Sequence, residues 1–251
     1  MNADIQYFVD GLRRNWIREF KPYENFKITI YLNSPICLSS PFIFFDSILN
    51  HLIFLNNLKR DYYIAPTKVN LSNYLPEAVS GHPIDKIYNK ENKLVVQSAS
   101  CGILDPNSKK LIAYIYKRFE EKYTTFGGKI HINQGHFKSY AMQHVYIPTE
   151  KVVFFVRGDY QFIQKMLTNL IAIGDDIRIG YGFIRNIKYE KMQEDHSIVY
   201  NSLAMRPIPV EFLDEYDDIA SLPYRSPYWD RKNVRLCAVP FSRVVFKKEY
   251  R

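Results

Sequence analysis

Apolar side chains at three- and four-residue spacing predict an amphipathic helix that begins after Asp159 and ends before Gly174. Asp159 is expected to cap the first turn, and Gly174 to supply the left-handed residue that often stops a helix. A glycine-punctuated loop, GDDIRIGYG (174–182), comes next, and FIRNIKYE (183–190) predicts a strand. The inner face of the helix consists of Ile163, Met166, Leu167, Leu170 and Ile171.

The same kind of pattern predicts elements along the rest of the chain. Residues 61–93 interrupt it, because prolines and polar residues break both periods there, and they indicate an irregular insertion. The remaining predicted elements are a short helix at 1–20, a strand at 26–36, a helix from Ser40 to about Lys59, a strand at 94–103, a basic helix at 109–122, a hairpin over 129–147 that turns at 133–135, and a buried strand at 151–158.

With the insertion set aside, the elements follow the order strand, helix, strands, strand, helix, strand. This βαββαβ order is typical of the ferredoxin-like fold, which RNA-recognition domains share with many other modules. The predicted fold class is therefore α+β, with a ferredoxin-like (RRM-like) core over residues 1–190. A long insertion or thumb hairpin is expected at about 60–150, and a β-rich C-terminal extension at 191–251.

The composition favours a polyanionic partner. The 251 residues include 34 Lys and Arg against 26 Asp and Glu, which gives a net charge of +8. They also include 20 Tyr and 17 Phe, and single-stranded nucleic acid is bound by such mixtures of basic and aromatic residues. A genome rich in A and T would enrich Tyr and Lys as well, so composition alone leaves both explanations open.

No cofactor, metal or membrane is expected. Cys37, Cys101 and Cys237 are far apart and odd in number, so they predict neither a disulfide framework nor a zinc knuckle. None of the six histidines lies at a metal-binding spacing. The sequence has no leader of the secretory type and no apolar run long enough to span a bilayer, which predicts a cytoplasmic protein.

Residues that suggest catalysis are few. His51 on the first long helix could act as a general base. His131 and His136 flank the tip of the predicted hairpin and could serve as acid and base in a ribonuclease that needs no metal. A basic tip that grips a phosphate backbone explains the same two residues with fewer assumptions. A metal-independent endoribonuclease is therefore the alternative function, and a protein-interaction module without an RNA role is a third.

The loop at 174–182 is the leading candidate for nucleic-acid contact. Its glycines let backbone amides approach a phosphate, the nearby arginines can neutralise it, and Tyr181 offers a ring for stacking. IGYGFIRN (179–186) partly matches the RNA-recognition signature, but a helix precedes it instead of a strand, so contact through the loop is preferred to contact through the sheet face. The alternative is a tight turn in which Gly180 and Gly182 pack against the helix and Arg178 is solvated.

Several short motifs, taken in their order, carry a resemblance to a known family. Residues 158–190 closely resemble the signature of the RAMP superfamily of CRISPR proteins, and the wider arrangement over about 28–240 resembles the Cas-five-type subunit of type IV CRISPR effector complexes. The positions that match the motifs outside the loop are Pro41, Asp46, Ile48, Leu49 and His51, then Lys138, Tyr140, Met142, Gly158 and Asp159, then Met205, Arg206, Pro207, Pro209 and Val210, and last Pro227, Tyr228 and Trp229.

The resemblance implies a non-catalytic structural subunit that binds RNA. Such a subunit caps the filament of backbone subunits and clamps the 5′ handle of the guide RNA, with the large subunit and target DNA as further contacts. Asp175 and Asp176 depart from the family, which has two basic residues there, and leave Arg178 as the cation of the loop. The residues that would contact RNA are Gly174, Arg178, Gly180, Tyr181, Gly182 and Arg185 at the loop, Lys129, His136 and Lys138 in the thumb, and Arg206 with Trp229 against RNA or a neighbouring subunit.

Overall fold

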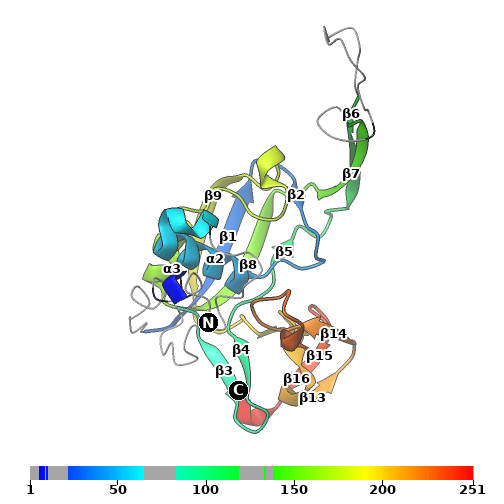
Figure 1. The fold of residues 1–251 in the computed structure, drawn as a ribbon. Coiled ribbons are helices and arrows are strands. Elements are labelled where there is room, and N and C mark those ends of the chain that lie inside the picture. The colour runs from blue at the N-terminus through cyan, green and yellow to red at the C-terminus, as the bar shows by residue number, and fades with distance from the viewer. Residues whose placement is uncertain are drawn as a thin grey trace, which may run out of the picture.

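A four-stranded antiparallel sheet forms the centre of the protein (Figure 1). The computed structural model describes residues 6–8, 10, 22–64, 83–118, 133 and 138–250. The sheet has the order β5-β8-β1-β9, so the first strand of the chain pairs with β8 on one side and with β9 on the other. Its strands are β1 (Glu24–Leu32), β5 (Ile103–Leu104), β8 (Lys151–Gly158) and β9 (Ile184–Met192).

Two helices cover one face of this sheet. They are α2 (Phe45–Leu58), which lies between β1 and β5 in the chain, and α3 (Tyr160–Leu167), which lies between β8 and β9. Alternate residues of β1, from Phe26 to Leu32, enter one core with residues of both helices. The intervening residues of β1, which include Tyr31, therefore point to the face opposite the helices.

The helix boundaries differ in part from those expected. Asp159 caps α3 as predicted, because Phe162 N donates to its carboxylate at 2.9 Å. The helix ends at Leu167, however, and Gly174 is not its C-terminal residue, since the chain turns and Ala172 then forms a strand-like bridge to Phe183. α2 ends at Leu58 as expected but begins at Phe45 instead of Ser40.

A two-stranded ribbon projects from the upper end of the sheet (Figure 1). It consists of β6 (Leu111–Lys117) and β7 (Tyr140–Ile147), and β2 (Ile36–Cys37) pairs with the base of β7. The basic helix predicted at 109–122 was therefore wrong for residues 111–117. A short apolar run rich in Ile and Tyr fits either period, and pairing with β7 decides for a strand.

The partner of β7 also differs from the prediction. Pairing within 129–147 was expected, but β7 pairs with β6 instead. The predicted turn at 133–135 and the predicted helix at 1–20 lie largely outside the described residues, although residues 6–8 and 10 are helical.

A second core lies beneath the sheet and joins the C-terminal residues to a hairpin from the predicted insertion. Leu94 and Val96 of this hairpin pack with Phe212, Tyr224 and other C-terminal residues. The strands are β3 (Lys86–Asn89), β4 (Leu94–Gln97), β10 (Val199–Tyr200), β11 (Leu203–Ala204), β12 (Ile208–Pro209), β13 (Leu213–Tyr216), β14 (Ile219–Pro223), β15 (Val234–Ala238) and β16 (Val244–Phe246). Short 3-10 turns are η1 (Lys59–Ile64), η4 (Ile177–Ile179), η5 (Val210–Phe212), η6 (Arg231–Asn233) and η7 (Lys248–Tyr250).

Arg206 connects the two cores from a fully buried position. One terminal nitrogen donates to the carbonyls of Gln97 and Ala99 at 2.7 and 2.8 Å. The other donates to the Tyr224 carbonyl at 2.8 Å and to the Tyr228 hydroxyl at 2.9 Å, and it lies 3.4 Å from the carboxylate of Asp46. Arg206 was predicted to contact RNA or a neighbouring subunit, and this position corrects that prediction, because no part of its side chain reaches the surface.

Tyr228 completes this buried network. Its hydroxyl donates to the Asp46 carboxylate, with oxygen–oxygen distances of 2.7 and 2.8 Å, and its ring stacks on Phe44 at 3.8 Å between centroids. Burial raises the pKa of Tyr228 well above 10.0, so the hydroxyl keeps the proton that it donates. Asp46, Arg206 and Tyr228 belong to three separate sequence motifs, and the fold brings them together at one point.

Replacing Asp46 with alanine should therefore destabilise the protein strongly. The change leaves the Arg206 charge buried without its carboxylate, and breaking such a pair costs about 3–5 kcal/mol. Urea unfolding followed by circular dichroism measures the loss. Asp214→Ala, on the exposed surface, is the control and should stay within about 0.5 kcal/mol of the parent. Equal stability of the two variants would contradict a structural role for the network.

Candidate nucleic-acid interface

Three segments meet at the upper end of the sheet: the loop Gly174–Gly182 (called the glycine loop below), the turn between β1 and β2, and the base of the ribbon. Backbone hydrogen bonds hold the loop to the turn. Asn33 N donates to Phe183 O, and Gly182 N donates to Pro35 O, both at 2.8 Å. Phe183 N donates to the Ser34 hydroxyl at 2.9 Å. The glycine loop is therefore attached to this turn at its C-terminal end.

The glycines of the loop have different roles. Gly182 is buried with φ +69°, and a Cβ atom there would lie 1.8 Å from the Ile173 carbonyl oxygen. Gly180 has φ +107°, is exposed, and has open space where a Cβ would be. The alternative prediction, a tight turn in which both glycines are packed, therefore fits Gly182. At Gly180 the backbone is open to an approaching ligand. Gly174 packs closely, since its Cβ would lie 2.6 Å from the Cys37 carbonyl oxygen.

The two acidic residues of the loop form contacts within the protein. The Asp175 carboxylate accepts from Ser39 N at 2.5 Å, and Asp175 N donates to Cys37 O at 2.8 Å. The Asp176 carboxylate lies 2.9 Å from Nδ1 of His144, a buried histidine on β7. The Asp175 backbone therefore fixes the loop to β2, the Asp175 carboxylate fixes it to Ser39 just after β2, and the Asp176 carboxylate fixes it to β7.

Tyr181 links the loop to the ribbon through its ring. It stacks on Tyr146 at 5.9 Å and on His144 at 6.3 Å between centroids, within the range of favourable aromatic pairs. Partial burial is the main cause that raises the pKa of Tyr181, so the phenol is neutral at neutral pH. His144 and Tyr146 were not predicted from the sequence, because only the fold places them beside the loop.

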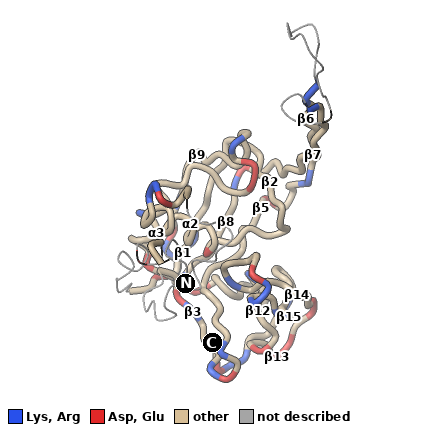
Figure 2. Tube along the Cα trace, viewed as in Figure 1, with Lys and Arg blue, Asp and Glu red and all other residues tan. Residues whose placement is uncertain are grey.

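The ribbon exposes aromatic and basic side chains together. Tyr114 and Tyr116 stack at 6.1 Å on one face, and Arg118 lies over the Tyr116 ring at 5.9 Å. Segments 106–118 and 138–149 contain no Asp or Glu, and in Figure 2 all charged residues along the described part of the ribbon are basic. The exposed cations of these segments are Lys109, Lys110, Lys117, Arg118 and Lys138.

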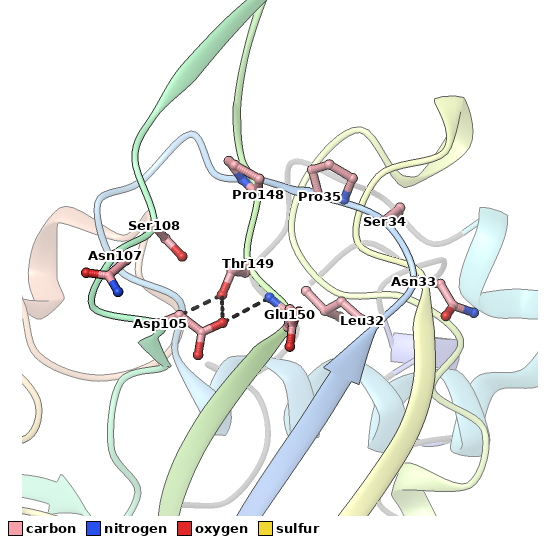
Figure 3. Close-up of a pocket in the computed structure, with 10 residues that line it drawn as sticks. All are labelled: Leu32, Asn33, Ser34, Pro35, Asp105, Asn107, Ser108, Pro148, Thr149 and Glu150. Atoms are coloured by element: carbon pink, nitrogen blue, oxygen red, sulfur yellow. Dashed lines mark hydrogen bonds between the residues drawn. The ribbon is translucent and has the colours of Figure 1, made fainter.

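A shallow cavity of about 400 Å³ opens beside the ribbon base, where β1 ends and β8 begins (Figure 3). Asp105 and Glu150 contribute carboxylates, and Asp105 accepts from Thr149 Oγ1 and from Glu150 N, both at 3.0 Å. No Lys or Arg lines the cavity, so it does not favour a phosphate. The lining residues are Leu32, Asn33, Ser34, Pro35, Asp105, Asn107, Ser108, Pro148, Thr149 and Glu150.

The other residues predicted to bind RNA are distributed over the molecule. Arg178 is exposed on η4 within the glycine loop, and Lys138 is exposed just before β7. Arg185 lies on β9 next to Tyr31 instead of on the loop. Trp229 is 65% exposed on the C-terminal part of the chain. Lys129 and His136 lie outside the described residues.

Of the histidines considered for catalysis, His131 and His136 lie outside the described residues, and His51 lies away from this interface. His51 lies on α2 and forms a 2.7 Å hydrogen bond between its Nδ1 and the Tyr62 hydroxyl, and partial burial lowers its pKa. Burial raises the pKa of Cys237 to about 12 and also raises that of Cys37, which disfavours the reactive thiolate. Within the described ranges, no group of three or more His, Cys, Asp or Glu side chains could hold a metal ion.

The fold and the interface define an α+β protein with an exposed basic and aromatic ribbon. The sequence model of the family described as CRISPR type IV associated protein Csf3 matches residues 79–240, more than half of the chain. The chain belongs to this family, which confirms the predicted resemblance to a type IV CRISPR subunit. The match contains the ribbon, the glycine loop, Arg206 and Tyr228.

Two further findings concern curated relatives of the chain and the length of its helices. No curated protein matches the sequence. None of the helices in the described ranges has the length and apolar character that a membrane crossing requires.

His144→Phe should loosen the glycine loop without unfolding the protein. Phenylalanine retains an aromatic ring beside Tyr181 but removes the bond to Asp176, which is worth about 1 kcal/mol. Hydrogen exchange at Ile179 and Gly180 should become about fivefold faster, while exchange in β1 stays unchanged. His196→Phe changes a histidine elsewhere and is the control. Unchanged loop exchange in His144→Phe would show that the bond does not hold the loop.

Proposed function

We propose that this protein is a non-catalytic, RNA-binding structural subunit of a type IV CRISPR ribonucleoprotein effector complex. It caps the filament of backbone subunits and clamps the 5′ handle of the guide RNA between the ribbon and the glycine loop. The observation that carries the proposal is the ribbon. Its described residues expose cations and tyrosines and include no Asp or Glu, and Tyr146 at its base stacks on Tyr181 of the loop. Membership of a CRISPR type IV family supports the same role.

We also propose that the central sheet and its two helices are a ferredoxin-like core of the RAMP type. The chain order β1-α2-β5-β8-α3-β9 corresponds to βαββαβ when β2, the hairpin of β3 and β4, and the ribbon are set aside. The sheet order β5-β8-β1-β9, with every neighbouring pair antiparallel, is what two such interleaved βαβ units produce. This support is independent of the sequence motifs, because it comes from strand pairing alone.

The contacts at the interface favour binding over chemistry. His144, the buried histidine closest to the glycine loop, is bonded to Asp176 and stacked near Tyr181, which suits a positioning role. His51 belongs to α2, on the helix-covered side of the sheet, whereas the ribbon projects from the upper end of the sheet. RNA held between ribbon and loop would therefore be bound through phosphates and stacked bases, and sequence would be read by base pairing of the guide.

Arg178→Glu should weaken RNA binding while the fold stays intact. The change replaces the exposed cation of the loop with a charge that repels phosphate, and losing a charged contact costs about tenfold in affinity. The purified full chain is titrated with a labelled single-stranded repeat RNA at several salt concentrations. Lys165→Glu, an exposed residue on α3, makes the same charge change and should have less effect. Equal effects of the two variants would rule against the loop as the contact.

The endoribonuclease alternative has a direct test. Incubation of the protein with full repeat RNA in EDTA should leave the RNA intact. Site-specific cleavage that His51→Ala or His136→Ala abolishes would establish the enzyme and overturn the non-catalytic role. Binding that does not change with salt would instead favour a protein-interaction module, because phosphate contacts make affinity fall steeply as salt rises.

A further inference from the structure

The face of the sheet opposite the helices carries a tyrosine at its upper end. Because Phe26, Ile28, Ile30 and Leu32 face the helices, Tyr31 points to the opposite face, where it is half-buried. This position lies at the end of β1 that leads into the turn held by the glycine loop. The face around Tyr31 is therefore adjacent to the proposed RNA contact.

A β-bulge in β9 brings Arg185 to the face on which Tyr31 and Lys188 lie. Tyr31 pairs with Asn186 and Leu32 pairs with Ile184, so Arg185 is an extra residue in the strand. In a regular strand, positions 185 and 188 would project to opposite faces, but a bulge re-aims the side chains that follow it. The Arg185 guanidinium carbon lies 5.8 Å from the ring centroid, and the Lys188 ammonium nitrogen lies 5.4 Å from it.

No carboxylate of the described residues neutralises Arg185 or Lys188, whereas two lysines lower on the same strands are paired with carboxylates. Lys27 pairs with Glu190 at 2.7 Å, and Lys191 pairs with Glu24. Neither Arg185 nor Lys188 forms an ion pair with a carboxylate of the described residues, and both are exposed. Cation–π contacts with Tyr31 hold them in place without neutralising them. An anion is therefore the complementary ligand for this surface.

We propose that Tyr31, Arg185 and Lys188 (the tyrosine patch) form a second contact surface for single-stranded RNA. This inference rests on the proposed function and extends it from the loop to the sheet. Arg185 follows Gly182 by only three residues, so an RNA strand that contacts the glycine loop can continue directly onto the patch. The two cations bind successive phosphates, and Tyr31 is the positioning residue that keeps them together.

The surroundings limit the patch to these residues. Lys151 lies opposite Tyr31 on β8, but its ammonium is 3.8 Å from the Asp105 carboxylate and is partly neutralised. The cavity beyond it has an acidic lining and does not continue the phosphate path. The sequence alone had favoured contact through the loop over contact through the sheet face, and the bulge is what brings Arg185 to that face.

The test compares salt dependence of RNA binding in matched double variants of the full chain. Arg185→Gln with Lys188→Gln should lower the slope of log affinity against log salt by about 1.4, since each neutralised phosphate of a single strand contributes about 0.7. The control, Lys165→Gln with Lys232→Gln, removes the same charge from exposed positions elsewhere and should change the slope little. The probe is a fluorescein-labelled oligouridylate, with duplex RNA of equal length alongside.

Three further comparisons separate the outcomes. Arg185→Lys keeps the charge and should retain the slope, and Tyr31→Phe keeps the ring and should also retain it, whereas Tyr31→Leu should weaken binding. A patch variant that behaves like the control overturns the patch, and if Arg178→Glu still weakens binding, the proposed function stands without it. If neither change has an effect, the proposed function fails as well. An equal loss with duplex RNA overturns the assignment to a single strand.

Discussion

The guanidinium of Arg206 is the interaction on which the arrangement of the two cores depends. It donates to carbonyls at the end of β4 and just after it, and to one of the C-terminal region, and it faces the Asp46 carboxylate on α2. A buried charge is costly unless it is paired and hydrogen-bonded, so these elements are held in one relative position. Because α2 also packs on the central sheet, the second core cannot move without exposing this charge. A residue that looked like a surface contact in the sequence is thus part of the framework.

Weaker contacts fix the glycine loop and the ribbon relative to each other at the upper end of the sheet. Asp175 and Asp176 fix the glycine loop to β2 and β7, and Tyr181 stacks on residues at the base of the ribbon. Loop and ribbon therefore have a defined geometry before any ligand binds. Preorganisation of this kind reduces the entropy that is lost on binding, which suits a clamp for a flexible RNA strand.

Charge is distributed unevenly over the molecule, and this unevenness separates framework from interface. Lower on the sheet, lysines are balanced by carboxylates of neighbouring strands, as with Lys27 and Glu190. On the described part of the ribbon and around Tyr31, cations lie beside aromatic rings instead. Cations next to aromatic rings therefore mark both surfaces that we propose to contact RNA.

The sequence by itself determined the order of the central elements, the cap at Asp159 and the family, because local periods, capping residues and ordered motifs carry that information. It did not decide that residues 111–117 form a strand, since that depends on pairing with a segment more than twenty residues away. It also could not place Arg206 in the core or His144 at the loop, because their partners are distant in the chain. Only the tertiary structure, through the bulge in β9, put Arg185 and Lys188 on one face around Tyr31.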